Sequence, residues 1–303
     1  MLAEARERVA RRTEMILVTG ASGSVGREVV REMLKTGKEF LAMYRSKEEA
    51  AKAPVSVKTA IADFADTASL ESALQGVESV FLVCSPIQAL VELEGNVIDT
   101  SKKTGVKRIV LNSALGAGDY DKSFPSWHRK VEDKLRASGV EFVILRPNGF
   151  MQNIVTYLAA SIRAQGVFYD AMGNAKTSLV DVRDVAAVAA RALTTDGHAG
   201  KIHELNGPEA VTQDEVAMKI AEKSGRAVKH VDLAREAHEK AMLDLGMPEW
   251  QVKALIELQD YYVSGRAATV DGLIAKLLGR PERTLDAFLS ENAGEFREQA
   301  ARA

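Results

Sequence analysis

The sequence predicts an α/β fold, a doubly wound parallel sheet followed by a smaller and mostly helical C-terminal region. Up to residue 150, short apolar runs alternate with amphipathic stretches of helical period, and strands that alternate with helices form parallel sheets. Beyond residue 150 the helical pattern dominates and few strand-like runs remain. We therefore expect an N-terminal extension at residues 1–14, a sheet domain at 15–150, and a smaller region at 151–303 packed on it.

The sheet domain contains six predicted strands joined by helices. The strands are expected at residues 15–18, 40–44, 56–62, 79–84, 108–112 and 141–145. The helices between them are expected at residues 25–36, 70–74, 90–103 and 127–137. Gly37, Gly76 and Gly105 stand where three of these helices should end, because glycine readily adopts the left-handed backbone conformation that follows a helix.

The region after residue 150 is predicted from helical periodicity alone. Its helices are expected at residues 184–193, 215–223, 234–245, 249–261 and 285–300. Thr212 and Glu215 have the spacing of a capping box, which marks the start of the second of these helices. Trp250, Tyr261 and Tyr262 lie on a predicted helix, where they either pack in a core or wall an aromatic pocket.

Three glycines, Gly20, Gly23 and Gly26, follow the first predicted strand directly and open the first helix. The first permits a tight turn, the second leaves room for a diphosphate against the backbone, and the third lets the helix pack closely on the sheet. The helix N-terminus then presents unpaired N–H groups and a partial positive charge to the anion. We therefore expect a Rossmann-type dinucleotide site. Its residues would be Thr19, Gly20, Ser22, Gly23, Ser24, Val25 and Gly26.

The residues after the second predicted strand indicate which dinucleotide is bound. A protein that prefers NAD usually carries Asp or Glu here to bind the adenosine ribose. This sequence instead reads Tyr44-Arg45-Ser46-Lys47, with no carboxylate before Glu48. Arg45 can pair with a 2'-phosphate, assisted by Ser46 or Lys47, and such a charge-assisted bond contributes about 1.5–3 kcal/mol. The sequence therefore predicts that NADP(H) is preferred over NAD(H).

Composition limits the classes of partner. The 303 residues include 40 basic and 42 acidic side chains, so no positive field favours nucleic acid or an anionic membrane. No apolar run approaches the roughly 20 residues that span a bilayer, and the N-terminus is charged, so we expect a cytoplasmic monomer or homodimer that binds a small molecule. Cys84 has no second cysteine to pair with, and His198 and His203 lack a third ligand, so no metal site is predicted.

Several motifs together resemble the NmrA-like group of atypical short-chain dehydrogenases. They are Thr19–Gly26, Tyr44–Ser46, Ala62–Phe64, Val106–Ser113, Leu145–Asn153 and Gly279–Phe288. The resemblance covers nearly all of residues 15–296. It implies an NADPH-dependent reductase of quinones, azo dyes or triphenylmethane dyes, or a regulatory protein that binds the dinucleotide without turning it over.

The resemblance also implies positions for the cofactor. Asp63 and Phe64 would flank the adenine. The path of the cofactor ribose would be lined by Val83, Cys84, Ser85 and Pro86. The residues beside the nicotinamide would be Pro147, Asn148, Gly149 and Phe150.

Ordinary short-chain dehydrogenases carry a serine after the fifth strand and a Tyr-x-x-x-Lys pair whose lysine lowers the pKa of the tyrosine. No tyrosine in this sequence has a lysine four residues later. Ser113 occupies the serine position, while His128 and Glu132 stand four residues apart on one helix face where the pair would be. His128 can donate a proton, and Glu132 would favour its charged form. The alternative is that His128 only packs and Ser113 only ends a strand.

This substitution bears on the chemistry. Reduction of an isolated ketone produces an alkoxide that needs a proton donor at once, whereas a reduced quinone or azo bond is a delocalised, weakly basic anion. The sequence therefore favours an NADPH-dependent oxidoreductase that transfers hydride to a quinone-like or other conjugated, aromatic small molecule. The alternative is a non-catalytic NADP(H)-binding redox sensor of the NmrA type. A sugar-nucleotide epimerase is disfavoured, since it relies on the missing Tyr-x-x-x-Lys pair.

Overall fold

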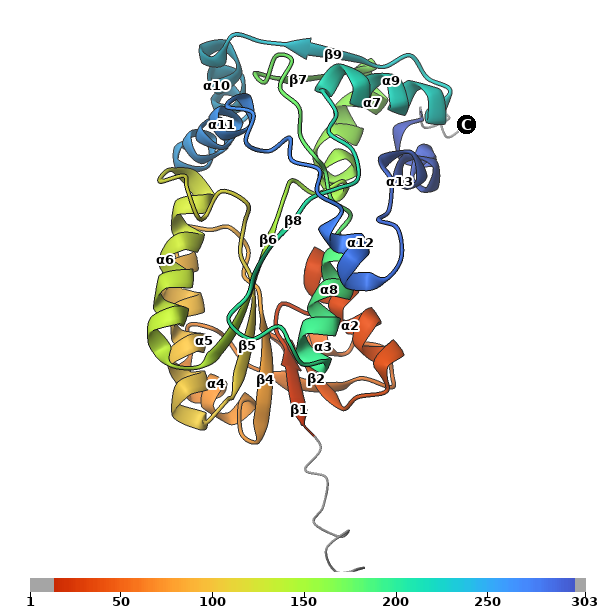
Figure 1. Cartoon of the computed structure of the whole chain (residues 1–303). Helices are drawn as coiled ribbons and strands as arrows, with labels where there is room; N and C mark the ends of the chain where they lie inside the picture. Colours follow the sequence, from red (N-terminus) through yellow and green to blue (C-terminus); the bar gives the residue numbers. More distant parts are fainter. Residues whose placement is uncertain (1–13, 298–303) are drawn as a thin grey trace, which may run out of the picture.

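The computed structural model describes residues 14–297, in which seven parallel strands form one sheet with helices on both faces (Figure 1). The strand order is β3-β2-β1-β4-β5-β6-β8, so it reverses direction between β1 and β4. The strands are β1 (Met15–Val18), β2 (Phe40–Tyr44), β3 (Lys58–Ile61), β4 (Val77–Leu82), β5 (Arg108–Asn112), β6 (Glu141–Pro147) and β8 (Ile202–Leu205). The expected N-terminal extension, apart from Glu14, lies outside the described residues.

Two helical layers enclose two apolar cores. One layer contains α2 (Ser24–Thr36) and α8 (Val182–Thr194), and the other contains α4 (Thr67–Ala73), α5 (Leu90–Thr104) and α6 (Ser123–Ser138). Successive strand side chains point to opposite faces, so Ile16 and Val18 pack in the first core while Leu17 packs in the second. All three are almost fully buried, and each such side chain contributes about 1.5–3 kcal/mol to folding.

The predicted strands and helices of the first 150 residues are confirmed, with boundaries that differ by up to four residues. The largest difference is at α6, which begins at Ser123 rather than at residue 127. Gly37 and Gly105 are left-handed C-caps as expected, and Gly76 has a φ of +74° two residues after the cap of α4. One short helix, α3 (Lys47–Ala50), was not predicted.

The C-terminal part contains a second, two-stranded parallel sheet at one end of the molecule, formed by β7 (Val167–Asp170) and β9 (Lys229–Asp232) (Figure 1). The helices of this part are a π-helix (Ile154–Leu158), α7 (Ala159–Gln165), α9 (Gln213–Ser224), α10 (Arg235–Asp244), α11 (Glu249–Val263), α12 (Leu273–Leu278) and α13 (Leu285–Glu291). The predicted capping box is confirmed at α9. The predicted single helix at 285–300 is wrong, because α13 ends at Glu291 and a 3-10 turn follows at Ala293–Phe296.

Two elements from beyond residue 150 complete the main sheet. The chain leaves β6, builds β7, and returns as α8 and β8, with β8 pairing in parallel with β6. The side chains of α8 pack on those of α2 in the first core. The division at residue 150 stays a prediction about domains, but the sheet itself draws on both sides of it.

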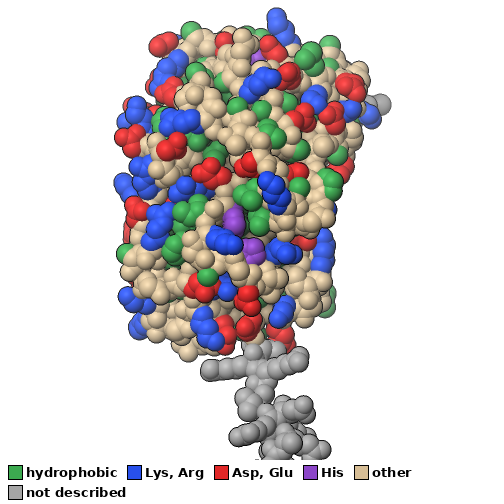
Figure 2. Space-filling view, in the orientation of Figure 1, with side chains coloured by type: hydrophobic (Ala, Val, Ile, Leu, Met, Phe, Trp, Pro, Cys, Tyr) green, Lys and Arg blue, Asp and Glu red, His purple; other side chains and the backbone are tan. Residues whose placement is uncertain are grey.

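Charged side chains are mixed over the surface. On the face seen in Figure 2, lysine and arginine are interspersed with aspartate and glutamate rather than gathered in one region. Within residues 14–297, no helix combines the length and the apolar character needed to cross a membrane.

Candidate functional site

The residues predicted to bind a cofactor gather at the carboxyl edge of the main sheet. The glycine motif follows β1, Arg45 follows β2, Asp63 follows β3, Cys84 follows β4, and Pro147 ends β6. All these strands are parallel, so their carboxyl ends meet at one edge. Open α/β sheets bind ligands at this edge, where the strand order reverses, and here that position lies between β1 and β4.

Two of the three glycines are required by the turn itself. Gly20 has a φ of +59°, and a Cβ there would lie 2.7 Å from Cγ1 of Val83. A Cβ on Gly26 would lie 2.1 Å from the carbonyl oxygen of Gly20, so α2 can approach the turn only without a side chain. Gly23 has an ordinary φ of −80°, and its Cβ would meet one atom, at 3.2 Å. The predicted roles of the first and third glycines are confirmed, while the role of Gly23 stays a prediction.

The N-terminus of α2 is free to receive an anion. Its N-cap is Gly23, which has no side chain to satisfy the N–H groups of the first turn, and that turn contains no acidic residue. In contrast, the side chains of Asp66 and Thr212 cap α4 and α9. The uncapped N–H groups and the positive end of the helix dipole therefore suit a phosphate group.

Thr19 supports this turn from beneath. Its buried hydroxyl donates a hydrogen bond to the carbonyl oxygen of Phe81 at 2.8 Å and accepts one from the N–H of Val83 at 3.1 Å. These bonds join the ends of β1 and β4. Thr19 therefore shapes the turn, and its role in binding the cofactor stays a prediction.

The residues after β2 include a carboxylate that sequence reasoning missed. Glu49 of α3 accepts a hydrogen bond from Oγ of Ser22 at 3.3 Å and lies 3.6 Å from Nη2 of Arg45. The Arg45 side chain is 75 % exposed. Ser46 is the N-cap of α3 and accepts a hydrogen bond from the N–H of Glu49 at 3.2 Å. Arg45 therefore stands where a 2'-phosphate was predicted to bind, but it already faces a carboxylate.

The segment after β3 is held by hydrogen bonds between side chains and the backbone. Asp63 is exposed and accepts a hydrogen bond from the N–H of Ala65, while the carbonyl oxygen of Phe64 accepts one from Asn96. Burial raises the pKa of Cys84 to about 12, so its thiol remains protonated. Ser85 and Pro86 are exposed. These residues line the edge where the prediction places them.

Glu94 is a second carboxylate that sequence reasoning missed. It is fully buried in α5, and neither carboxyl oxygen has a hydrogen-bond partner of normal geometry among the described residues. Burial raises its pKa to about 8, and the nearby backbone N–H of Cys84 lowers it by less. Glu94 is therefore largely protonated at neutral pH. A signal was present in the sequence, since Leu90, Val97 and Ile98 lie on the same apolar helix face.

Ser113 and Glu132 lie together behind the end of β5. The hydroxyl of Ser113 donates a hydrogen bond to Oε1 of Glu132 at 2.6 Å. Glu132 also accepts two hydrogen bonds from Arg146, at 2.9 and 2.7 Å, and one from Arg136 at 2.7 Å. Burial raises the pKa of Glu132, but the hydrogen bonds from Arg146 and Ser113 outweigh it and hold the pKa below its ordinary value. Glu132 is thus a buried, neutralised anion that orients Ser113.

His128 does not have the charge that the sequence suggested. It is buried, its Nδ1 has no hydrogen-bond partner among the described residues, and burial lowers its pKa to about 4. The charge of Glu132 raises that pKa, but by less than burial lowers it. Glu132 thus favours the charged form of His128, as expected, but burial outweighs this effect. His128 is a neutral imidazole near pH 7.

The segment after β6 is fixed by Asn148. Its side-chain amide donates hydrogen bonds to Asn206 and to the carbonyl oxygen of Ala267, and its side-chain oxygen accepts one from the N–H of Gly149. Phe150 packs partly buried against the first core. This arrangement positions the residues predicted to lie beside the nicotinamide.

Of the three aromatic residues singled out on α11, one reaches this segment. Tyr261 is buried against Tyr120 and Arg266, so it packs in a core. A Cβ on Gly149 would lie 3.3 Å from the hydroxyl of Tyr262, which places that hydroxyl beside the predicted nicotinamide segment. Burial raises the pKa of Tyr262 to about 12, so it can act as a hydrogen-bond donor.

Comparison with known proteins places this geometry in context. A family model described as NAD(P)H-binding matches residues 20–196. The chain is 34 % identical over 284 residues to an NAD(P)H azoreductase of Xenophilus azovorans, covering 93 % of this chain and 99 % of the relative. It is 31 % identical over 275 residues to quinone oxidoreductase 2 of Escherichia coli, covering 89 % of this chain and 96 % of the relative.

Solved structures agree with the fold. The NADPH-dependent quinone oxidoreductase of Escherichia coli in complex with NADPH superposes with a TM-score of 0.85 and 31 % identity, over 92 % of this chain and 99 % of that one. Triphenylmethane reductase of Citrobacter sp. superposes with a TM-score of 0.82 at 24 % identity, over 92 % of this chain and 99 % of that one, which supports the fold alone. The predicted doubly wound fold with C-terminal helices is therefore confirmed.

Proposed function

The chain belongs to the NAD(P)H-binding, NmrA-like family of atypical short-chain dehydrogenases, and we propose that it is a reductase that transfers hydride from NADPH to a quinone-like or other conjugated acceptor. The turn at Gly20 and the uncapped N-terminus of α2 fit a dinucleotide diphosphate. Bound NADPH would supply the hydride. The printed names of the relatives, an azoreductase and a quinone oxidoreductase, support acceptors of this class.

The side chains at the edge have separate roles in this proposal. The N–H groups of the first turn of α2 hold the diphosphate, and Arg45 exchanges Glu49 for the 2'-phosphate. Ser113 donates its hydroxyl hydrogen to Glu132, so its oxygen can accept a hydrogen bond only from the hydroxyl or N–H group of the reduced product. Asn148 fixes the backbone beside the nicotinamide position.

One observation carries the choice of acceptor, namely that the polar groups available near this edge are weak acids. The imidazolium form of His128 has a pKa of about 4, so near pH 7 the residue is a neutral imidazole, a very weak acid, and Tyr262 has a pKa of about 12 without a lysine to lower it. An alkoxide needs a stronger, activated donor. A quinone or azo acceptor spreads the incoming charge over a conjugated system, so hydrogen bonds from neutral groups suffice.

The proposal is tested by following NADPH oxidation by the full chain against three acceptors, a quinone, an azo dye and an isolated ketone. We expect turnover of the conjugated acceptors and none of the ketone. Turnover of the ketone alone would contradict the proposal. Tight NADPH binding without turnover of any acceptor would instead favour the redox-sensor alternative.

A second experiment assigns the role of His128. If the imidazole donates a hydrogen bond to the acceptor, His128→Ala should lower turnover by at least about tenfold while NADPH affinity is unchanged. Tyr262→Phe tests the phenol in the same way and retains its ring packing. Unchanged turnover in both variants would leave these residues with a packing role.

A further inference from the structure

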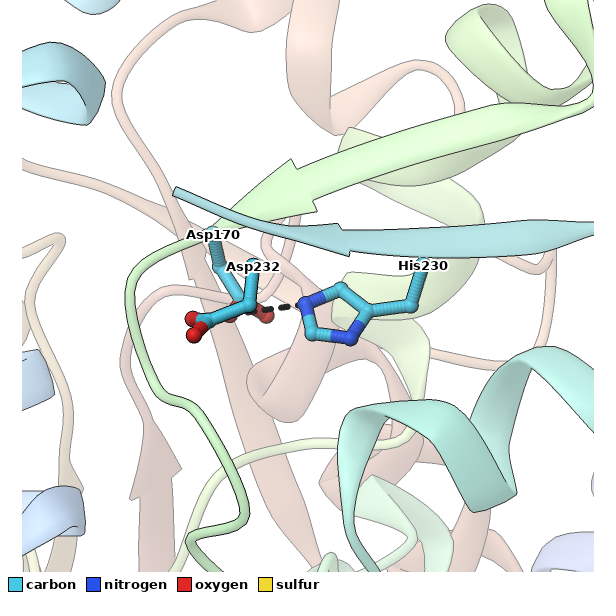
Figure 3. Close-up of side chains that lie close together, drawn as sticks. All are labelled: Asp170, His230 and Asp232. Atoms are coloured by element: carbon cyan, nitrogen blue, oxygen red, sulfur yellow. Dashed lines mark hydrogen bonds and ion pairs between the residues drawn. The ribbon is translucent and has the colours of Figure 1, made fainter. Parts of the chain in front are cut away.

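The two-stranded sheet holds a cluster of side chains suited to a metal ion. Asp170 ends β7, and His230 and Asp232 lie two residues apart on β9. One side-chain atom from each lies within 4.8 Å of the others, and Figure 3 shows the two carboxylates beside each other with the histidine ring directed toward them. None of these three residues was singled out from the sequence.

Strand geometry explains why the three side chains converge. Residues two apart on a strand point to the same face, which places His230 and Asp232 together. Asp170 is the register partner of Asp232 across the pair, and residues directly opposite each other share a face. The side chains of Asp170 and His230 are nearly buried, whereas Asp232 is exposed, so the cluster is anchored inside but open to solvent on one side.

The orientation of His230 is typical of a metal ligand. Its Nδ1 lies 3.0 Å from Oδ1 of Asp214, in the first turn of α9, and its Nε2 lies 3.0 Å from Oδ1 of Asp170. A neutral imidazole that donates its Nδ1–H to Asp214 presents the lone pair of Nε2 to the two other carboxylates. Metal-bound histidines commonly donate their second N–H to a carboxylate in this way, which fixes the tautomer and the ring.

The charges of the cluster favour a cation. Asp170, Asp232 and Asp214 surround one imidazole, and none of the three forms an ion pair with a lysine or arginine within residues 14–297. Backbone N–H groups hold two of the carboxylates in place, since Met172 donates to Oδ1 of Asp170 at 2.9 Å and Gly173 donates to Oδ1 of Asp232 at 2.8 Å. The carboxylates are therefore oriented before any ligand arrives.

We propose that Nε2 of His230 and the carboxylates of Asp170 and Asp232 bind one divalent transition-metal ion, such as Zn²⁺, Mn²⁺ or Co²⁺. One imidazole and two carboxylates suit these ions, and water completes the coordination shell. Asp214 is a positioning residue that orients His230. The ion ties β7 to β9 and takes no part in hydride transfer.

The test uses the full chain, freed of metal with a chelator and desalted, then titrated with Zn²⁺ or Co²⁺ by calorimetry. We expect one ion to bind per chain, Co²⁺ to develop visible absorption, and the thermal unfolding temperature to rise with added ion. Asp232→Asn keeps the oxygen that accepts from Gly173 and should weaken binding by about tenfold or more. Asp214→Asn should weaken it by about tenfold.

The controls distinguish a metal ion at these three residues from a histidine bridge and from an ion bound elsewhere. Asp244→Asn changes an exposed carboxylate on α10 that pairs with Lys240, and it should bind the ion as the unmodified chain does. If no ion binds, His230 only joins Asp170 and Asp214 through hydrogen bonds and the proposal is wrong. It is equally wrong if Asp232→Asn has no effect, or if binding is lost in His203→Ala, since His198 and His203 form a separate pair with ring centroids 5.8 Å apart. NADPH binding by Asp232→Asn should be unchanged.

Discussion

The two parallel sheets of this protein end in candidate sites of opposite character. At the carboxyl edge of the main sheet, glycines remove side chains and leave the N–H groups of α2 to meet an anion. At the end of the two-stranded sheet, Asp170, His230 and Asp232 supply side chains that would meet a cation. Parallel strands bring their ends together in both cases, so the residue types at those ends decide the sign of the ligand. The strand topology therefore determines where each candidate site lies, and the residues at the strand ends determine which ligand the site suits.

The largest effect on stability is expected when a side chain is added at Gly26, where the neighbouring backbone leaves no room for one. In Gly26→Ala, the new Cβ would lie 2.1 Å from a backbone oxygen that cannot move without distorting the turn, which should destabilise the fold by about 3 kcal/mol. Urea unfolding measures this loss. Gly95→Ala is the matched control, because its Cβ would meet only the flexible Lys134 side chain at 3.2 Å. Equal stabilities of the two variants would contradict the close approach described for α2.

A second comparison concerns a buried carboxylate with no hydrogen-bond partner among the described residues. The ordinary pKa of Glu94 is 4.5 and the folded protein raises it to about 8. Below 4.5 both states are protonated, but as pH rises toward 8 only the unfolded chain releases the proton, so stability is lost across this window. Glutamine does not titrate, so Glu94→Gln should lack this loss. Its free energy of unfolding should exceed that of the unmodified chain by about 2 kcal/mol between about pH 5 and pH 7.

Urea unfolding at several pH values measures the effect of Glu94→Gln. Glu92→Gln, an exposed position on the same helix, should retain the pH dependence of the unmodified chain. If Glu94→Gln and Glu92→Gln show the same dependence of stability on pH, the pKa of Glu94 is not raised by burial.

The variant Arg45→Ala tests the predicted anion site. Loss of the guanidinium should weaken NADPH binding by about tenfold and leave NADH binding nearly unchanged, because only NADPH has the 2'-phosphate. Fluorescence titration with both nucleotides measures the difference. Arg31→Ala, an exposed position on α2 that pairs with Glu28, should affect neither nucleotide. Equal losses for NADPH and NADH would remove the assignment of Arg45.

The smallest expected effect comes from Glu49→Gln. The carboxylate competes for Arg45 and repels a phosphate, and an exposed charge interaction of this kind is worth about 0.5–1 kcal/mol. The variant should therefore raise the preference for NADPH over NADH by about threefold, and added salt should reduce the gain. Glu39→Gln, beyond the other end of β2, is the control. If the preference for NADPH over NADH falls instead, Glu49 helps NADPH to bind by holding Arg45 in place.

The sequence predicted the features that are formed by neighbouring residues and missed those that are formed by residues far apart in the chain. The glycine motif, the six strands of the first 150 residues and the position of Ser113 follow from local patterns. The strands β7, β8 and β9 have four residues each and include polar ones, so no apolar run marked them. The cluster at Asp170 and His230 joins residues 60 apart, a proximity that only the folded chain creates.

The charge states of buried side chains could not be predicted from the sequence either. The spacing of His128 and Glu132 placed both on one helix face correctly, but the arginines that neutralise Glu132 come from a later turn of α6 and from β6. Burial then decides the pKa of His128, and burial depends on the whole fold. Glu49 was passed over because it lies in a short helix that no periodicity indicated.

The return of the chain to the main sheet has a consequence for how the molecule can be divided. Because α8 covers α2 and β8 extends the sheet beside β6, a fragment truncated after residue 150 would expose Val29, Met33 and their neighbours to water. Such a fragment would aggregate rather than fold. The main sheet of this protein is thus complete only once the chain has been synthesised to the end of β8 at Leu205.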